Sequence, residues 1–213
     1  EPFQLACPIS FTQLPFQPTV SSEEYDTSIN RIMNLITEGD TYQVNYSFRL
    51  KSRFDGDPFE FFLQLINAQP SSNGAFIATD DFAICSASPE LFFSLTGERI
   101  VTRPMKGTVP RGLTSKDDKR NAESLRYSEK NRAENLMIVD MMRNDIGRIA
   151  ETGSVRVPAL FDIEKYPTVW QMTSTVEAKT NASVTDIVSA LFPCGSITGA
   201  PKARTMEIIA ELE

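Results

Sequence analysis

The chain has 213 residues, a formal net charge of −7 and no histidine. A composition of 41% hydrophobic and 23% charged residues is that of one globular domain with its own core, and it excludes disordered and collagen-like proteins. The missing histidine excludes Ser-His-Asp catalysis and imidazole-bound zinc, so proton chemistry must use carboxylates, lysine, tyrosine, cysteine or water.

The charge and the cysteines restrict the partners and the compartment. The negative charge argues against a nucleic-acid or anionic-membrane partner, and no apolar run reaches the roughly 18–20 residues that span a bilayer. Cys7, Cys85 and Cys194 are odd in number and widely spaced, so we expect free thiols in a reducing cytoplasm. Any metal would be a hard, oxygen-liganded ion, with magnesium as the first candidate.

The first third of the chain predicts two helices and a strand. Residues 1–21 are interrupted by prolines and are interpreted as a connecting segment ahead of a domain over 22–213. Ser21 and Glu24 form a capping box for the first helix. The expected elements are a helix that Gly39 closes, a half-buried strand of alternating polarity over residues 42–50, and a short helix that begins at Asp57-Pro58.

Strands dominate the middle of the chain, and antiparallel strands interrupted by helices imply an α+β, sandwich-like fold with helices packed outside. Two hairpins are expected, across Asp80-Asp81 and across residues 96–98. Residues 111–119 are polar and predict a mobile loop. Further predicted elements are one helix over residues 120–150 with Leu136, Val139 and Met142 in its buried stripe, strands over 155–163 and 168–176, and helices near 184–191 and 202–212.

Lys106 lies in a predicted turn, residues 103–108, that directly follows a strand. An amine beside exposed backbone N–H groups suits a carboxylate ligand and can act as a nucleophile or a base. A nucleophilic amine must be neutral, which a nearby cation such as Arg103 or a metal would favour. An ordinary solvated lysine after a strand is the alternative.

Glu90 follows Ser88-Pro89 and stands beside the apolar residues 91–93. Such surroundings raise the pKa of a carboxyl and suit a general acid, whereas a turn glutamate that faces water is the alternative.

Glu134 shares a helical face with Ile138 and Asp145, since eleven residues are close to three turns. A carboxylate on a mostly apolar face needs a metal or a cation, such as Arg132 or Arg143. We expect Asp145 itself to terminate the helix.

Residues 195–202 form a glycine-hinged turn that opens a helix at Pro201. Their spacing fails the GxxxxGK[ST] pattern of a phosphate loop. The turn could still offer N–H groups and the Thr198 hydroxyl to an anion.

Five segments, taken in order, closely resemble those of the chorismate-binding enzymes, and the match runs from about residue 22 to the end. Within this family the chain is most similar to the aminodeoxychorismate synthases of the para-aminobenzoate branch of folate synthesis, because these carry lysine at the position of Lys106 where anthranilate synthases carry alanine. The segments are Gly39 to Asn45, Ser88-Pro89-Glu90, Arg103 to Thr108, Ala133 to Asp140 with Arg143 to Arg148, and Gly195 to Lys202 with Met206 to Ile209.

The resemblance implies an enzyme that converts chorismate and ammonia into 4-amino-4-deoxychorismate. Lys106 would attack C2 of chorismate while Glu90 protonates the departing C4 hydroxyl, and ammonia would then open the covalent adduct at C4. The ammonia would come from a glutamine amidotransferase subunit.

Roles for four more residues follow from the resemblance. Gly107 and Thr108 would hold a substrate carboxylate, Thr198 would contact the ring, and Glu134 would ligate a magnesium ion that bridges to the ring carboxylate. Many anthranilate-type relatives have a histidine where this chain has Gln171, which can donate a hydrogen bond but carries no proton at neutral pH.

The helical pattern still continues at Glu213, which predicts a truncated chain. The family resemblance implies further metal ligands, substrate-binding residues and strands beyond this point, so we expect these 213 residues alone to show little or no turnover. Two alternatives remain open. One is an anthranilate synthase component with an unusual lysine, and the other is a non-catalytic module that holds an aromatic effector with Tyr42, Asn45 and residues 69–73.

Overall fold

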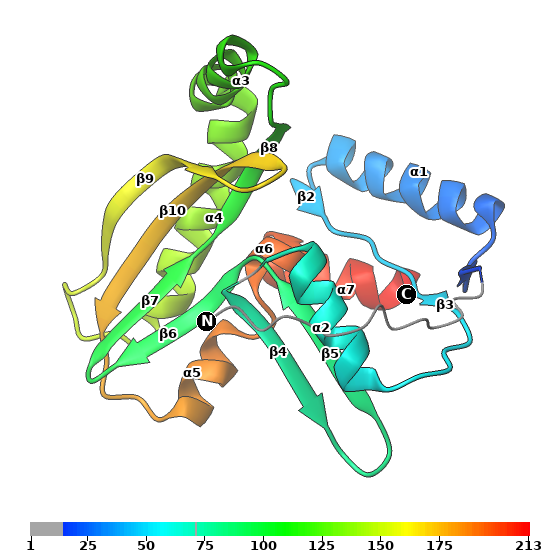
Figure 1. Cartoon of the computed structure of the whole chain (residues 1–213). Helices are drawn as coiled ribbons and strands as arrows, with labels where there is room; N and C mark the ends of the chain where they lie inside the picture. Colours follow the sequence, from blue (N-terminus) through cyan, green and yellow to red (C-terminus); the bar gives the residue numbers. More distant parts are fainter. Residues whose placement is uncertain (1–14, 71) are drawn as a thin grey trace, which may run out of the picture. The chain divides into compact units, whose positions relative to one another are not determined.

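The computed structural model describes residues 15–70 and 72–213 (Figure 1). The chain forms two compact units: unit 1 comprises Glu1–Asp26 and Ser47–Pro89, and unit 2 comprises Thr27–Tyr46 and Glu90–Glu213. Cys85 and Cys194 are free thiols, whereas Cys7 lies outside the described residues. None of the helices within the described ranges has the length and hydrophobicity of a membrane-spanning segment.

Unit 1 contains a β-hairpin packed against a helix. The helix begins where the sequence predicts, because the Asp57 carboxylate accepts hydrogen bonds from the next free N–H groups and Pro58 occupies the first turn. The predicted hairpin across Asp80-Asp81 is also confirmed. The elements of this unit are β1 (Gln17–Pro18), β3 (Leu50–Lys51), α2 (Pro58–Ala68), β4 (Asn73–Ala78) and β5 (Ala83–Ser88).

Helix α1 (Ser22–Glu38) begins with the predicted capping box. The Ser21 backbone N–H donates to the Glu24 carboxylate at 2.7 Å, and the Glu24 N–H donates to the Ser21 hydroxyl at 3.2 Å. Each residue thereby satisfies a backbone donor of the first turn that the helix itself leaves unpaired.

Unit 2 is built on a five-stranded antiparallel sheet, which confirms the predicted α+β fold class. Strand β10 lies at its centre: β7 and β8 pair with successive parts of one edge, and β9 pairs with the other edge. The strands are β6 (Leu91–Thr96), β7 (Arg99–Arg103), β8 (Met105–Pro110), β9 (Arg156–Lys165) and β10 (Val169–Lys179).

Helix α4 (Glu129–Gly147) lies along one face of this sheet and builds the core with it (Figure 1). Leu136 was expected in the buried stripe but is 49% exposed, because the buried face contains Asn135 and Leu136 lies about 100° further around the axis. The buried core residues are Ile100, Ile138, Val139, Met142, Ile146, Val176, Ala178, Ile187, Leu191 and Cys194.

The single helix predicted over residues 120–150 is two helices, α3 (Ser115–Tyr127) and α4. The break falls at Ser128, whose hydroxyl accepts the N–H of Asn131 and so caps the second helix. Serine favours N-caps over helix interiors, so Ser128 was a local signal for this boundary that the prediction of one helix missed.

The mobile loop predicted over residues 111–119 is wrong. The Arg111 guanidinium forms two hydrogen bonds with the Asp118 carboxylate, at 2.5 and 2.7 Å, and lies over the Trp170 ring. The Trp170 indole N–H also donates to Asp118, at 2.8 Å. The hydrogen bonds from Arg111, assisted by those from Gly112 and Trp170, hold the pKa of Asp118 well below its ordinary value.

The strand predicted over residues 42–50 is also wrong in extent. Only β2 (Gln43–Val44) and the start of β3 are extended and paired there, because β2 has a partner of only two residues, β11 (Gly199–Ala200). Alternating polarity does not produce a long strand where no long partner exists. The predicted C-terminal helices are confirmed as α5 (Val184–Leu191) and α7 (Lys202–Leu212), and a four-residue helix, α6 (Gly195–Thr198), lies between them.

Gly107 combines a left-handed backbone with a close neighbour. Its φ is +95°, and a Cβ atom there would lie 3.0 Å from Cβ of Asn131. We therefore expect Gly107→Ala to lower the free energy of unfolding by about 1–3 kcal/mol, measured by urea denaturation. Gly153→Ala is the matched control, since its φ is +79° but nothing lies within 4 Å of the added atom. An equal loss in both variants would show that the contact with Asn131 is unimportant.

Candidate active site

Lys106 lies inside strand β8 and not in a turn, which corrects the sequence interpretation. Pro104 interrupts the ladder because it has no N–H, but pairing with β10 resumes at Met105. The Lys106 side chain is half-buried, and its Nζ donates a hydrogen bond to the carbonyl oxygen of Ser196 at 2.9 Å. The solvated lysine considered as the alternative is therefore wrong.

Ser196 is the residue at which three distant segments meet. Its carbonyl oxygen accepts from Lys106 and also from Asn45 Nδ2, at 2.8 Å. Its side chain forms a hydrogen bond with the carboxyl of Glu90, which also bonds to the backbone of Met105. The structure therefore brings the predicted nucleophile and the predicted acid to one buried serine.

The surroundings of Glu90 favour its protonated form. Burial raises the pKa of this carboxyl, and the opposing effects of the Ser196 hydrogen bond, the Met105 N–H and the Lys106 charge only reduce that shift. Glu90 therefore keeps its proton to a higher pH than an ordinary glutamate does. This is the property required of a general acid.

Thr108 and Gln171 lie opposite each other on β8 and β10. The Thr108 hydroxyl, on an exposed residue, donates to the Gln171 amide oxygen at 2.7 Å, while Gln171 is itself buried. Gln171 thus orients a predicted carboxylate-binding residue. The Thr198 hydroxyl is also buried and donates to the carbonyl of Cys194 at 3.1 Å, so it holds the backbone around Ser196.

Glu134, the predicted metal ligand, lies on α4 beside a lysine. Its nearest ion-pair partner is Lys130, one turn earlier in α4, at 3.9 Å, and its side chain is 39% exposed. Within residues 15–70 and 72–213 no three His, Cys, Asp or Glu side chains are grouped to hold a metal. The described residues therefore do not fit a magnesium site by themselves.

The cations proposed as alternative partners of Glu134 are engaged elsewhere. Arg132 lies over the Phe161 ring, 4.6 Å from its centroid, and Arg143 pairs with Asp140 at 2.7 Å.

Asp145 does not terminate α4, contrary to expectation, because the helix continues to Gly147. Its buried carboxylate pairs with Lys202 Nζ at 2.9 Å. No pattern in the sequence predicted a role for Ser196 or Lys202 by itself. The only available signal was their position in the segment 195–202, whose contacts depend on a fold that brings α4 and α7 together.

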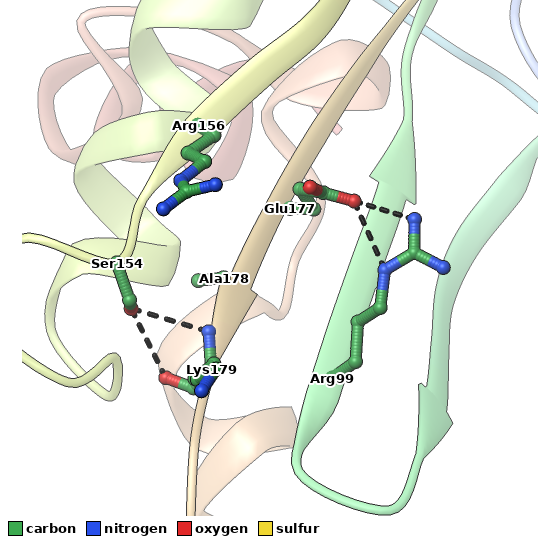
Figure 2. Close-up of a pocket in the computed structure, with 6 residues that line it drawn as sticks. All are labelled: Arg99, Ser154, Arg156, Glu177, Ala178 and Lys179. Atoms are coloured by element: carbon green, nitrogen blue, oxygen red, sulfur yellow. Dashed lines mark hydrogen bonds and ion pairs between the residues drawn. The ribbon is translucent and has the colours of Figure 1, made fainter.

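A separate shallow pocket of about 170 Å³ lies on the strands at the far end of the sheet and contains none of these residues. Figure 2 shows Glu177 directed toward Arg99, which donates to it at 2.5 and 3.0 Å. An exposed ion pair of this kind contributes little to stability. The pocket is lined by Arg99, Ser154, Arg156, Glu177, Ala178 and Lys179.

The raised pKa of Glu90 predicts a pH dependence of stability. Because its pKa is higher in the folded state than in the unfolded chain, its contribution to stability is present at low pH and is lost as the pH rises above about 4.3, the ordinary glutamate value. The unfolding free energy of the wild type relative to Glu90→Gln should therefore fall over that range in urea titrations. Ser196→Ala, which removes a bond to the carboxyl, should raise the pKa of Glu90 further in ¹³C NMR titrations. A constant difference between wild type and Glu90→Gln would contradict the prediction.

Comparison with known proteins identifies relatives over nearly the whole chain. The family described as chorismate binding enzyme matches residues 8–213. Aminodeoxychorismate synthase component 1 of Klebsiella aerogenes is 48% identical over 200 residues, which cover 93% of this chain and 44% of that protein. Anthranilate synthase component 1 of Aquifex aeolicus is 42% identical over 195 residues, which cover 91% of this chain and 40% of that protein.

The structural comparison gives the same answer. The crystal structure of anthranilate synthase component I from Streptococcus pneumoniae TIGR4 matches with a TM-score of 0.85 and 34% identity, over 95% of this chain and 45% of that one. The chain therefore spans less than half the length of these relatives. Since the family match extends over nearly all of its residues, this chain belongs to the chorismate binding enzymes.

Proposed function

We propose that the protein containing this chain is an aminodeoxychorismate synthase component 1, which aminates chorismate at C4. The observation that supports this most directly is the meeting of Lys106 and Glu90 at Ser196, because a lysine nucleophile and a general acid are what the reaction requires. The 48% identity to the Klebsiella aerogenes synthase supports the same assignment.

The two residues divide one difficult substitution into two steps. The neutral Lys106 amine forms a bond to C2 of chorismate while the ring double bond shifts and the C4 hydroxyl leaves, and Glu90 donates the proton with which it departs as water. Ammonia then bonds to C4, the double bond shifts back, and the C2–nitrogen bond to Lys106 breaks. The amine is regenerated, and the product is 4-amino-4-deoxychorismate.

Substrate binding must overcome an unfavourable overall charge, because chorismate is a dianion and the chain carries −7. Gly107 N–H and the Thr108 hydroxyl are the groups we propose for a substrate carboxylate, and Thr198 shapes the backbone near the ring. Glu134 remains the proposed magnesium ligand. Among the described residues it belongs to no group of three His, Cys, Asp or Glu side chains that could hold the ion.

The source of ammonia and the compartment are also part of the proposal. The name "component 1" of the relatives supports a second subunit, and we propose a glutamine amidotransferase that supplies ammonia. A cytoplasmic location agrees with the free thiols of Cys85 and Cys194.

The product of the reaction distinguishes this function from that of anthranilate synthase. The protein at its native length, incubated with chorismate, ammonium and Mg²⁺, should accumulate 4-amino-4-deoxychorismate and release no pyruvate, as followed by liquid chromatography with mass detection. Anthranilate and pyruvate formed without an added lyase would contradict the proposed subfamily.

Lys106→Ala tests the covalent step. The wild-type protein should gain the mass of dehydrated chorismate on Lys106 when ammonium is omitted, and Lys106→Ala should show neither this mass nor product. Glu90→Gln, which keeps the shape of the side chain, should lower the rate roughly 10²–10⁴-fold. A chain that binds an aromatic ligand with unchanged affinity in Lys106→Ala, and never gains mass, would instead be a non-catalytic binding module.

A further inference from the structure

The segment that carries Ser196 has little regular structure of its own. Between the end of α5 at Leu191 and the start of α7 at Lys202 it contains only the four residues of α6 and the two of β11. Yet it presents one carbonyl to Lys106 and one side chain to Glu90. Something outside the segment must therefore hold it in place.

Lys202 joins both ends of this segment to helix α4. Its Nζ donates to the carbonyl oxygen of Leu191 at 3.1 Å and to the Asp145 carboxylate at 2.9 Å. The ammonium thus closes residues 191–202 into a loop at its base and ties that base to α4. We call these two hydrogen bonds the Lys202 clamp.

The clamp is shielded from solvent. The side chains of Lys202 and Asp145 are 17% and 10% exposed, and Asp145 shares the buried face of α4 with Met142 and Ile146. Charges in such surroundings are screened less by water and salt than surface charges are. Their hydrogen bonds are also charge-assisted and therefore directional.

The backbone of the clamped segment packs closely against its neighbours. A Cβ atom on Gly195 would lie 2.3 Å from Met141 Sδ, one turn before Asp145 on α4. A Cβ atom on Gly199 would lie 1.9 Å from the carbonyl oxygen of Gln43. Because the backbone is packed this closely on both sides of Ser196, movement at its base is transmitted to Ser196.

We propose that Asp145 and Lys202 are positioning residues of the candidate active site, which act by fixing Ser196 against Lys106 and Glu90. Neither residue contacts the amine or the acid. The expected effect of these residues on catalysis rests on the proposed function. Their expected effect on the positions of Ser196 and Lys106 does not.

The competing explanation is that the ion pair only stabilises the fold. Replacing both members of a buried ion pair by apolar residues of similar size is often neutral or stabilising, whereas removing one member leaves an unpaired charge. The double variant Asp145→Leu/Lys202→Met therefore removes the clamp while it keeps most of the packing. If the pair serves stability alone, this variant leaves the site unchanged.

The experiment measures the site directly in the protein at its native length, without substrate. Reductive methylation followed by peptide mass analysis reports the labelling rate of Lys106, with Lys130, which is 84% exposed, as the internal standard. Hydrogen exchange reports the Asn45 amide, which donates to the Thr198 carbonyl at 2.7 Å. The control is Arg99→Met/Glu177→Leu, which removes an ion pair at the other end of the sheet, beside the shallow pocket.

In the clamp variant, with cooperative unfolding retained, we expect Lys106 labelling and Asn45 exchange to accelerate about tenfold, the effect of losing one hydrogen bond to a charged group. The control variant should change neither rate. Unchanged rates in the folded clamp variant would overturn the proposal.

If the double variant does not fold, Asp145→Asn decides the question, because it keeps the shape of the side chain and removes only the charge. An increase of about threefold or more in Lys106 labelling supports the clamp, and no increase overturns it. These measurements need no chorismate, so they stay informative even if the mass-shift assay were to contradict the proposed function.

Discussion

The hydrogen bond from Lys106 Nζ to the Ser196 carbonyl is the contact on which the functional interpretation depends. It directs a half-buried amine toward a segment that is remote in sequence, and the same serine bonds to Glu90. The predicted nucleophile and the predicted acid are therefore bonded to the same residue. In the proposed reaction this preorganisation matters, since a small displacement of either group greatly reduces the rate.

Helix α4 and strands β8 and β10 join several of the family segments around the candidate site. Helix α4 packs on β10 through an apolar face, and Asp145 on the same face pairs with Lys202. Strand β10 in turn pairs with β8 at Met105 and at Thr108, on either side of a register shift that contains Lys106. Each segment thus has a packing role and a site role at once, and both depend on the central sheet of unit 2.

Local signals in the sequence were sufficient for elements that local chemistry decides. The capping box at Ser21 and the Asp57-Pro58 helix start form because side chains a few residues apart satisfy backbone N–H groups. The hairpins around Asp80-Asp81 and residues 96–98 follow from turn chemistry. By contrast, the strand over 42–50 and the loop over 111–119 were wrong, since their structures depend on β11 and on Trp170, which lie elsewhere in the chain.

The sequence by itself determined the fold class, the absence of histidine chemistry and, through five ordered segments, the family whose resemblance predicts roles for Lys106 and Glu90. Only the tertiary structure decided that these two meet at Ser196, that Glu134 belongs to no group of three potential metal ligands among the described residues, and that Asp145 binds Lys202. The reason is that such contacts join residues separated by tens of positions. Their distances are set by how α4, β8, β10 and the segment before α7 pack, which no local pattern encodes.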